Sequence, residues 1–233
     1  MNAAGDSEQL KAFFQTGHKR HYQKNELILS AGEEPPGVCL IESGMLKIYL
    51  IDRHGNERIT HFFGAGDFFP IIWLLRGLNR SENYRALEPL TMWVVPRDEL
   101  LKLIMNSKEI LAEMLDEMVE RYLRYARRIE NLLYSDARSR CAYRLLSLVN
   151  RFGQPRGEGL VINANITQED MARSVNMTRE TFGRCLSRFH QKGQIDYDEE
   201  RHIIIHDVGA LVKIIGRQEA EATWPNLMKY ITD

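Results

Sequence analysis

The first third of the chain alternates between apolar and polar residues in short runs that are separated by turn-forming residues. Residues 38–43 and 45–51 flank a Ser-Gly break, residues 52–56 read Asp-Arg-His-Gly-Asn, and residues 57–63 alternate again. Alternation with a period of two is typical of half-buried strands, and Gly, Asn and Asp between such runs mark hairpin turns. A closing strand is expected at residues 91–96. Many short strands at this spacing predict an antiparallel β-barrel or jelly roll.

Helical patterning replaces the strands after Pro96, where a short helix is expected to begin. Residues 107–133 contain neither Gly nor Pro and are predicted to form one long helix. Apolar or aromatic residues recur along it at alternating spacings of four and three: Leu111, Leu115, Met118, Tyr122, Tyr125, Ile129 and Leu132. Such a heptad repeat keeps two helices in contact along one stripe. Because the intervening faces are rich in Glu and Arg, we expect a dimer seam; packing of the stripe on the barrel of its own chain is the alternative.

Two short helices joined by a tight turn are predicted by the segment ITQEDMARSVNMTRETFGRCLSRFHQK. Thr167 is placed to cap the first helix, with Asp170 completing a capping box. Thr178 is placed to cap the second helix, after a turn at Asn176 and Met177. The expected inner faces are Met171, Ala172 and Val175 in the first helix and Phe182, Cys185, Leu186 and Phe189 in the second. This is the pattern of a helix–turn–helix.

Shorter elements are expected around this helix pair. They are a helix from Asp136 to about Phe152, a loop at residues 153–159, a strand at residues 160–163, and a hairpin wing formed by residues 194–197 and 202–205. The chain is therefore predicted to be an α+β protein. Its expected parts are a jelly-roll β-barrel domain at residues 1–106, a dimerisation helix at 107–135, a winged helix–turn–helix at 136–207 and a helical extension at 208–233, which we expect to pack on the DNA-binding domain.

Composition and charge restrict the class of partner. The longest apolar run, FFPIIWLL, is far shorter than the roughly 20 residues that cross a bilayer. The N-terminus also lacks the basic start and apolar core of a signal peptide, so we expect a cytoplasmic protein without a membrane partner. The net charge is −1, but residues 138–206 contain 11 Lys and Arg against 8 Asp and Glu. This local basic excess indicates an acidic partner at the helix–turn–helix.

The exposed face of the second helix is expected to be strongly basic. It carries Arg179, Glu180, Arg184, Arg188 and Lys192. An Arg can hold guanine with two hydrogen bonds, and a Glu can accept one from cytosine N4. The first residues of a recognition helix reach base edges, so we expect double-stranded DNA as the partner. The alternative is an ordinary charged surface on which Glu180 and Arg184 form an ion pair one helical turn apart.

The order of barrel, long helix and winged helix–turn–helix, together with the segment TRETFGR, resembles the CRP/FNR family of bacterial transcription regulators. The resemblance extends to about Asp207, and Arg179 and Gly183 are similar to the cyclic-AMP receptor branch rather than the oxygen-sensing branch. It implies a homodimer that reads an imperfect palindrome of TGTGA-like half-sites and contacts RNA polymerase. It further implies base reading by Arg179, Glu180 and Arg184, and phosphate contacts by Thr167, Gln168 and Thr178, to which we add the basic Arg188.

In this family the barrel binds an effector, classically cyclic AMP, in a cassette that begins like Gly66-Asp67-Phe68 and ends like Arg80-Ser81. The Gly-Glu-Leu that holds the ribose in cyclic-AMP binders is replaced by Pro70-Ile71-Ile72, and the Thr-Ser pair of the long helix by Tyr125-Ala126. Proline lacks a backbone donor and isoleucine accepts no hydrogen bond. We therefore expect a different small molecule, or none, in place of cyclic AMP in its familiar pose; a classical cyclic-AMP response with an altered pocket is the alternative. The candidate pocket residues are Phe68, Ile71, Ile72, Arg80, Ser81 and Tyr125.

Metal and enzyme chemistry have less support. The three cysteines, Cys39, Cys141 and Cys185, lie far apart in the sequence and predict neither a disulfide framework nor an iron–sulfur cluster, which needs about four thiolates. Haem sensing remains an alternative, with His18, His21, His61 and Cys39 as possible axial ligands.

A cupin-type enzyme would need a His-x-His pair, which the chain lacks. A sensing module that no longer binds DNA would not need Arg179, Glu180 and Arg184. We therefore expect a regulator and not an enzyme.

Overall fold

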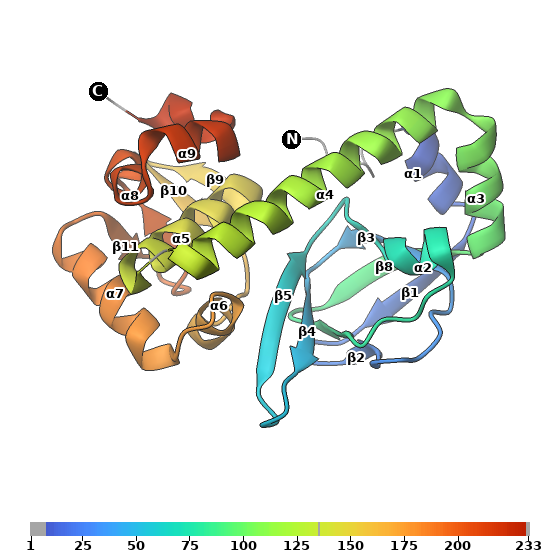
Figure 1. Ribbon diagram of the computed structural model, residues 1–233, viewed down its shortest axis with the longest axis horizontal. Helices are drawn as coiled ribbons and strands as arrows, with labels where there is room; N and C mark the ends of the chain where they lie inside the picture. The colour runs from blue at the N-terminus through green and yellow to red at the C-terminus, as the bar shows by residue number, and fades with distance from the viewer. Residues whose placement is uncertain (1–7, 135, 232–233) are drawn as a thin grey trace. The chain divides into compact units, whose positions relative to one another are not determined.

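The computed structural model describes residues 8–134 and 136–231, which form two compact units (Figure 1). The first unit is Met1–Arg124 and the second is Tyr125–Asp233. The boundary falls within the long helix α4 (Lys108–Tyr134), so residues 108–124 of that helix belong to the first unit and residues 125–134 to the second. Residues 1–7, 135 and 232–233 lie outside the described residues. The start of the predicted barrel domain and the ends of the predicted dimerisation helix and C-terminal extension fall on them. Among the described residues, no helix has the length and apolar character that a membrane crossing requires.

Two four-stranded sheets build the first unit. Their strand orders are β1-β8-β3-β6 and β2-β7-β4-β5. The strands are β1 (His18–Tyr22), β2 (Leu27–Leu29), β3 (Val38–Ser43), β4 (Leu46–Ile51), β5 (Glu57–Phe63), β6 (Phe68–Phe69), β7 (Asn83–Ala86) and β8 (Leu90–Val95). The neighbouring strands pair antiparallel. The predicted antiparallel barrel is confirmed, and β3 and β5 have the bounds that the alternation indicated.

Apolar side chains from both sheets form one buried cluster. Its members are Leu29, Cys39, Ile41, Leu46, Ile48, Phe63, Phe69, Tyr84, Ala86, Leu90, Met92 and Val94. Phe69 stacks on Tyr84 with ring centroids 5.2 Å apart, and its ring centroid lies 6.0 Å from that of Phe63. Three aromatic rings therefore fill part of the space between the sheets, where they contribute a large share of the buried apolar surface.

Four helices cover the other apolar cluster of this unit. They are α1 (Glu8–Phe14), α2 (Ile71–Arg76), α3 (Arg97–Asn106) and the first half of α4. The run FFPIIWLL folds as β6, a cis peptide between Phe69 and Pro70, and α2, which ends at Gly77 with a positive φ of 65°. Phe68, Ile71 and Leu74 are buried in this cluster together with Ile110 of α4. Most of the run is therefore core that attaches the helices to the barrel.

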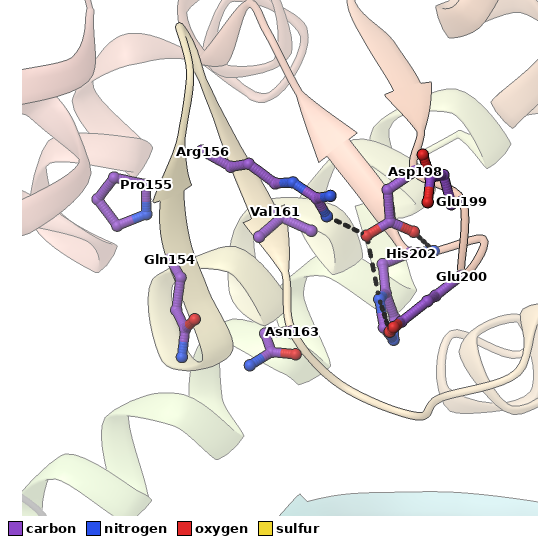
Figure 2. A pocket seen from close by; sticks show the side chains of 9 residues that line it. All are labelled: Gln154, Pro155, Arg156, Val161, Asn163, Asp198, Glu199, Glu200 and His202. Carbon is purple, nitrogen blue, oxygen red and sulfur yellow. Dashed lines mark hydrogen bonds and ion pairs between the residues drawn. The ribbon is translucent and has the colours of Figure 1, made fainter.

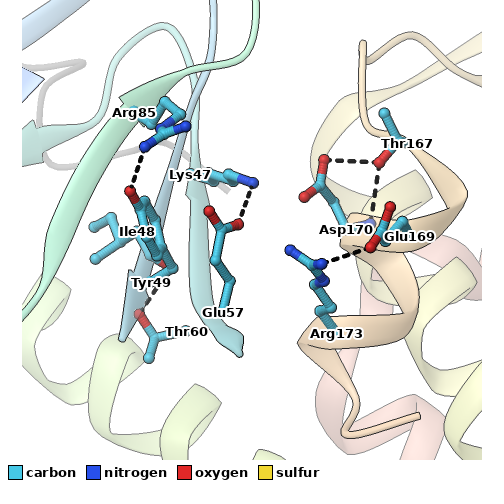
Figure 3. Close-up of polar contacts among 10 residues, drawn as sticks. All are labelled: Lys47, Ile48, Tyr49, Glu57, Thr60, Arg85, Thr167, Glu169, Asp170 and Arg173. Carbon is cyan, nitrogen blue, oxygen red and sulfur yellow. Dashed lines mark hydrogen bonds and ion pairs between the residues drawn. The ribbon is translucent and has the colours of Figure 1, made fainter. Parts of the chain in front are cut away.

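Polar contacts join β4 to its two neighbouring strands (Figure 3). Lys47 of β4 forms an ion pair with Glu57 of β5, with Nζ and Oε2 2.7 Å apart. Arg85 of β7 donates from Nη2 to the Tyr49 hydroxyl at 2.9 Å. The buried Lys47 thus has a carboxylate partner, as a cation away from water requires.

The second unit has three helices of the helix–turn–helix region, a small sheet and a C-terminal extension. Its elements after α4 are α5 (Ala137–Phe152), β9 (Gly153–Arg156), β10 (Gly159–Ile162), α6 (Gln168–Ser174), α7 (Arg179–Gln191), β11 (Ile195–Tyr197), β12 (Ile203–Ile205), α8 (Val208–Ile215), α9 (Arg217–Thr223) and the 3₁₀ helix η2 (Pro225–Tyr230). The sheet order is β11-β12-β10-β9. The predicted hairpin wing is therefore present as β11 and β12.

The prediction of a loop at residues 153–159 is wrong in part. Gly153–Arg156 forms β9, which pairs antiparallel with β10. Pro155 made this segment look irregular, because proline cannot donate to a sheet. The strand tolerates proline since β9 lies at the edge of the sheet, where one side needs no partner.

Residues 208–231 pack on the DNA-binding unit, as the sequence led us to expect. Helix α8 contacts α5. Trp224, between α9 and η2, is buried with its ring centroid 5.1 Å from that of Tyr143 in α5. Leu227 of η2 is also buried. The extension therefore shares the core of this unit.

Candidate DNA-binding surface and effector pocket

Helix α6 begins with the predicted cap. Thr167 Oγ1 accepts a hydrogen bond from the Asp170 backbone N–H at 3.1 Å and donates to Asp170 Oδ2 at 2.8 Å (Figure 3). Asp170 is buried, so its carboxylate is committed to holding the first turn. Thr167 and the half-buried Gln168, both predicted phosphate contacts, lie side by side at the start of this helix.

The turn between α6 and α7 is tight. The Met177 backbone N–H donates to Ala172 O at 3.0 Å, and Asn176 has a positive φ of 52°, a conformation that asparagine tolerates better than most residues. Val175 and Met177 are buried on either side of Asn176. The predicted helix–turn–helix is therefore present with the predicted turn residues.

Helix α7 presents one apolar and one charged face. Thr178 caps it by accepting from the Thr181 backbone N–H at 3.2 Å. The predicted inner residues Phe182, Cys185, Leu186 and Phe189 are all buried. The exposed residues are Arg179, Glu180, Arg184, Arg188 and Lys192. The three predicted base readers thus lie within the first two turns of one exposed helix face.

Glu180 is available as a hydrogen-bond acceptor. Arg184 Nη2 donates to the Thr181 hydroxyl at 3.2 Å. Within residues 136–231, no ion pair joins Glu180 to Arg184, so the structure does not support a charged surface pair as the reason for this carboxylate. A carboxylate beside several arginines weakens the attraction of a helix for phosphate, and a carboxylate can accept a hydrogen bond from cytosine N4.

Gly183 leaves room for the end of the Gln168 side chain beside α7. A Cβ at this position would lie 2.8 Å from Gln168 Nε2, closer than such atoms can approach. Any larger residue would therefore push aside the Gln168 amide, a predicted phosphate contact. The sequence motif contained Gly183, but this reason for it is visible only in the structure.

The wing carries a polar cavity of about 230 Å³ beside β9 and β10 (Figure 2). Arg156 forms an ion pair with Asp198, and His202 Nδ1 lies 3.3 Å from Asp198 Oδ2. Glu199 and Glu200 add two more carboxylates to the lining. The carboxylates of this turn disfavour the approach of a phosphate. In the part of the chain that is described, no group of three His, Cys, Asp or Glu side chains is arranged to hold a metal ion.

The exposed face of α4 carries most of the predicted seam. Tyr122 is 70% exposed and Ile129 is 57% exposed, and Leu111, Leu115 and Tyr125 are also exposed. Leu132 is half-buried. Met118 departs from this stripe, because its side chain packs against the core of the first unit. Val119, which the heptad spacing missed, is 56% exposed in its place.

The predicted pocket residues within the first unit differ in their exposure. Phe68 and Ile71 are buried in the apolar core cluster of the first unit. Ile72 and Ser81 are exposed, and Tyr125 belongs to the second unit. The sequence could not separate core from pocket here, because an apolar run fits both.

Arg80 has a carboxylate partner within the chain. Its Nε lies 3.3 Å from Glu82 Oε2 and its Nη2 lies 3.4 Å from Glu82 Oε1. Glu82 is buried and also lies 3.4 Å from the Thr60 hydroxyl. A cyclic phosphate would have to compete with this carboxylate for Arg80. The prediction named Arg80 and Ser81 but overlooked the acidic residue that follows them.

Arg121 is a polar contact between α4 and the barrel that sequence reasoning missed. Its Nη2 donates to Phe68 O at 3.2 Å, and its Nε lies 2.6 Å from Glu117 Oε1. The guanidinium lies over the Phe63 and Phe68 rings, 5.1 and 5.7 Å from their centroids. The i,i+4 spacing of Glu117 and Arg121 could have predicted the ion pair but not the contact with the barrel.

Three of the four residues considered for haem have identified surroundings within the first unit. Burial raises the pKa of the Cys39 thiol to about 12. His21 Nδ1 lies 3.1 Å from the Thr91 hydroxyl, and His61 packs against Phe63 with ring centroids 5.8 Å apart.

Comparisons with known proteins agree with this architecture. Residues 19–107 match the cyclic nucleotide-binding domain family, and residues 139–214 match the Crp-like helix-turn-helix domain family. A CRP-like cAMP-activated global transcriptional regulator of Mycobacterium tuberculosis is 26% identical over 192 residues, covering 82% of this chain and 85% of that protein.

Solved structures share the fold across most of the chain. A CooA variant from Carboxydothermus hydrogenoformans has a TM-score of 0.75 and 19% identity, covering 91% of this chain and 93% of its own. FixK2 from Bradyrhizobium japonicum has a TM-score of 0.74 and 20% identity, covering 86% and 98%.

A sensor-type barrel followed by a capped, basic helix–turn–helix defines a DNA-binding transcription regulator, and not an enzyme. The chain belongs to the CRP/FNR family of these regulators.

Proposed function

We propose that this regulator acts as a cytoplasmic homodimer that reads a palindrome of TGTGA-like half-sites. The observation that carries the proposal is the exposure of Arg179, Glu180 and Arg184 on the first two turns of α7, with Glu180 free of an ion pair to Arg184. Their chemistry suits guanine and cytosine edges in the major groove. Thr167, Gln168, Thr178 and Arg188 would contact phosphates around them.

The exposed apolar stripe on α4 supports the dimer. Monomeric proteins rarely leave a continuous row of large apolar side chains in water, and rows of this kind mark interfaces. With Val119 in place of Met118, the exposed apolar stripe includes Leu111, Leu115, Val119, Tyr122 and Ile129. A two-fold pair of such helices would place two copies of α7 against the two halves of a palindrome. Contact with RNA polymerase follows from the family resemblance alone.

The proposed DNA specificity can be tested by fluorescence anisotropy with a labelled TGTGA palindrome and a scrambled duplex of the same composition. We expect a Kd of about 10⁻⁸ to 10⁻¹¹ M for the palindrome near physiological salt, and binding that is at least about 1,000-fold weaker for the scrambled duplex. The affinity should fall linearly with salt on a log–log scale, because each neutralised phosphate releases counterions. Equal affinity for both duplexes at every salt concentration would refute the proposal.

We further propose that cyclic AMP in its familiar pose is not the effector. Arg80 is paired with Glu82, and Ile71, which stands in the ribose-binding segment, is buried in the core. The interior aromatic rings of Phe63, Phe69 and Tyr84 occupy space between the sheets. A different small molecule, or none, fits these observations better.

Cyclic AMP at millimolar concentration should therefore leave the melting temperature unchanged in differential scanning fluorimetry. A ligand present at 100 times its Kd stabilises the native state by about 2.7 kcal/mol. For a chain of this size that corresponds to a shift of roughly 5–10 °C, which the method resolves easily. Cyclic GMP and AMP serve as chemically matched controls. A rise with cyclic AMP alone would favour the classical cyclic-AMP response with an altered pocket.

A further inference from the structure

Two neighbouring arginines of α4 contact the ends of two helices in the DNA-binding unit. Arg127 Nη2 donates to the carbonyl oxygen of Ala222, in the last turn of α9. Arg128 Nη2 donates to the carbonyl oxygen of Ser174, the last residue of α6, at 3.1 Å. Consecutive helical residues point about 100° apart, so the two side chains extend in different directions. The C-terminal part of α4 is thus attached to the rest of the second unit at two separate places.

Both contacts match the electrostatics of helix ends. The last carbonyls of a helix have no partner within it and carry partial negative charge. Arginine supplies several donors and a charge of the complementary sign. Both arginines bond backbone oxygens, which makes the contacts independent of the side chains at those two positions.

The end of α6 receives two further arginines, both from α5. Arg144 Nη2 donates to Ser174 O at 3.1 Å, and Arg140 Nη1 donates to Val175 O at 3.3 Å. Arg144 is buried; desolvation lowers its pKa to about 9, with the nearby charge of Arg128 acting in the same direction. The guanidinium therefore remains charged near neutral pH. Helices α4 and α5 both hold the same carbonyl of α6.

This carbonyl lies only a few residues before the recognition helix. The tight turn that follows is fixed by the hydrogen bond from Met177 to Ala172, and α7 starts with the base readers Arg179 and Glu180. Because this hydrogen bond and the buried Val175 and Met177 hold the turn, an anchor at Ser174 constrains the direction of α7 relative to the C-terminal part of α4. The second anchor is the hydrogen bond from Arg127 to Ala222. Ala222 belongs to the C-terminal extension, which packs on α5 through Trp224 and Tyr143.

We infer that Arg127 and Arg128 are positioning residues that fix α4 against the DNA-binding unit and so set the half-site separation that the dimer accepts. This inference rests on the proposed dimer along α4. With α7 fixed relative to α4, the two recognition helices of a dimer are held at one distance and one angle. One added base pair shifts a half-site by about 3.4 Å and rotates it by roughly 35°, which a fixed pair cannot follow.

The test uses the full chain with Arg127→Met and Arg128→Met together. Methionine keeps an apolar stem and removes the donors and the charge. Ser174 O still accepts from Arg144, and Ala222 is exposed so that water can replace Arg127. We therefore expect the variant to fold. The matched control is Arg217→Met, an exposed arginine of α9 that pairs with Glu221 within its own helix.

The first readout is affinity for palindromes whose spacer is lengthened or shortened by one base pair. We expect the parent and the control to lose roughly 100-fold in affinity when the spacing changes, about the effect of a mismatched base pair in each half-site. The double variant should lose less than about tenfold, while its affinity for an isolated half-site stays unchanged. A merely structural role would not change the spacing preference. Equal spacing preference in parent and double variant would overturn the inference.

The second readout does not need DNA. Spin labels at Glu130→Cys in α4 and Ser187→Cys in α7 report the α4–α7 distance by double electron–electron resonance, with labelled chain diluted into unlabelled chain. Both sites are exposed, and the three native cysteines are buried. We expect one narrow distribution in the parent and a broadened one in the double variant. An equally narrow distribution in both would overturn the inference, whereas a parent that binds no palindrome would refute only the proposed function.

Discussion

Replacing Tyr122 and Ile129 together by aspartate will convert the protein from dimers to monomers and abolish tight binding to the palindrome. Both side chains are largely exposed in the single chain, so their replacement leaves the fold of each unit intact. In the proposed dimer they would be buried against their two-fold copies. An unpaired carboxylate in such an interface costs several kcal/mol, and like charges would face each other across the axis.

Sedimentation equilibrium measures the expected change in mass, and anisotropy measures the loss of DNA affinity. Two linked recognition helices gain about 10²- to 10⁴-fold from effective concentration, and monomers lose this gain. Met105→Asp is the matched control, because Met105 is 75% exposed on α3 and lies outside the stripe. If the Tyr122/Ile129 variant keeps the dimer mass, α4 is not the seam.

Glu180→Ala will relax recognition at a single base pair of each half-site and leave the others unchanged. Glu180 is exposed at the start of α7, with no ion pair to Arg184. The substitution therefore removes an acceptor for cytosine N4 and breaks no ion pair with Arg184. Discrimination at this base pair should fall by about 1–3 kcal/mol, while total affinity changes little because a negative charge near phosphate is also removed.

The measurement is a set of anisotropy titrations against all single-base variants of one half-site. Glu169→Ala is the matched control, since Glu169 is an exposed carboxylate on α6 that pairs with Arg173. It should alter total affinity without changing discrimination at any position. A uniform change at all positions for Glu180→Ala would remove Glu180 from the base-reading set.

Local sequence signals were sufficient for much of the fold and for the DNA-binding surface. Caps at Thr167 and Thr178 and the buried face of α7 follow from hydrogen-bonding groups and periodicity within a few residues. The strands β3 and β5 follow from alternation bounded by turn residues. These elements depend little on distant parts of the chain, so their prediction needed no tertiary information.

The effector side depends on distant contacts, and there the sequence was a poorer guide. The run FFPIIWLL is apolar at every position, so no periodicity could separate a pocket wall from the core that contains Phe68 and Ile71. The ion pair of Arg80 with Glu82 requires knowing how the chain turns after Ser81. Met118 lies on the predicted stripe but packs against the core of the first unit, whereas Val119 is exposed, and this difference depends on contacts with residues distant in the sequence.

The contacts of Arg127 and Arg128 could not be anticipated at all. Backbone carbonyls accept them, and no residue type marks a carbonyl in a sequence. From the sequence, the many Glu and Arg residues of α4 predicted only that these faces of the helix are exposed to water.

Selection from a pool of random duplex DNA tests the central claim most directly, because it presupposes no site. Full-length protein is mixed with the pool near physiological salt, and bound duplexes are amplified and sequenced over several rounds. We predict enrichment of a palindrome whose half-sites resemble TGTGA, centred about one helical turn apart. A pool that remains random, or one that converges on an unrelated or non-palindromic motif, would contradict the proposed dimeric reading by Arg179, Glu180 and Arg184.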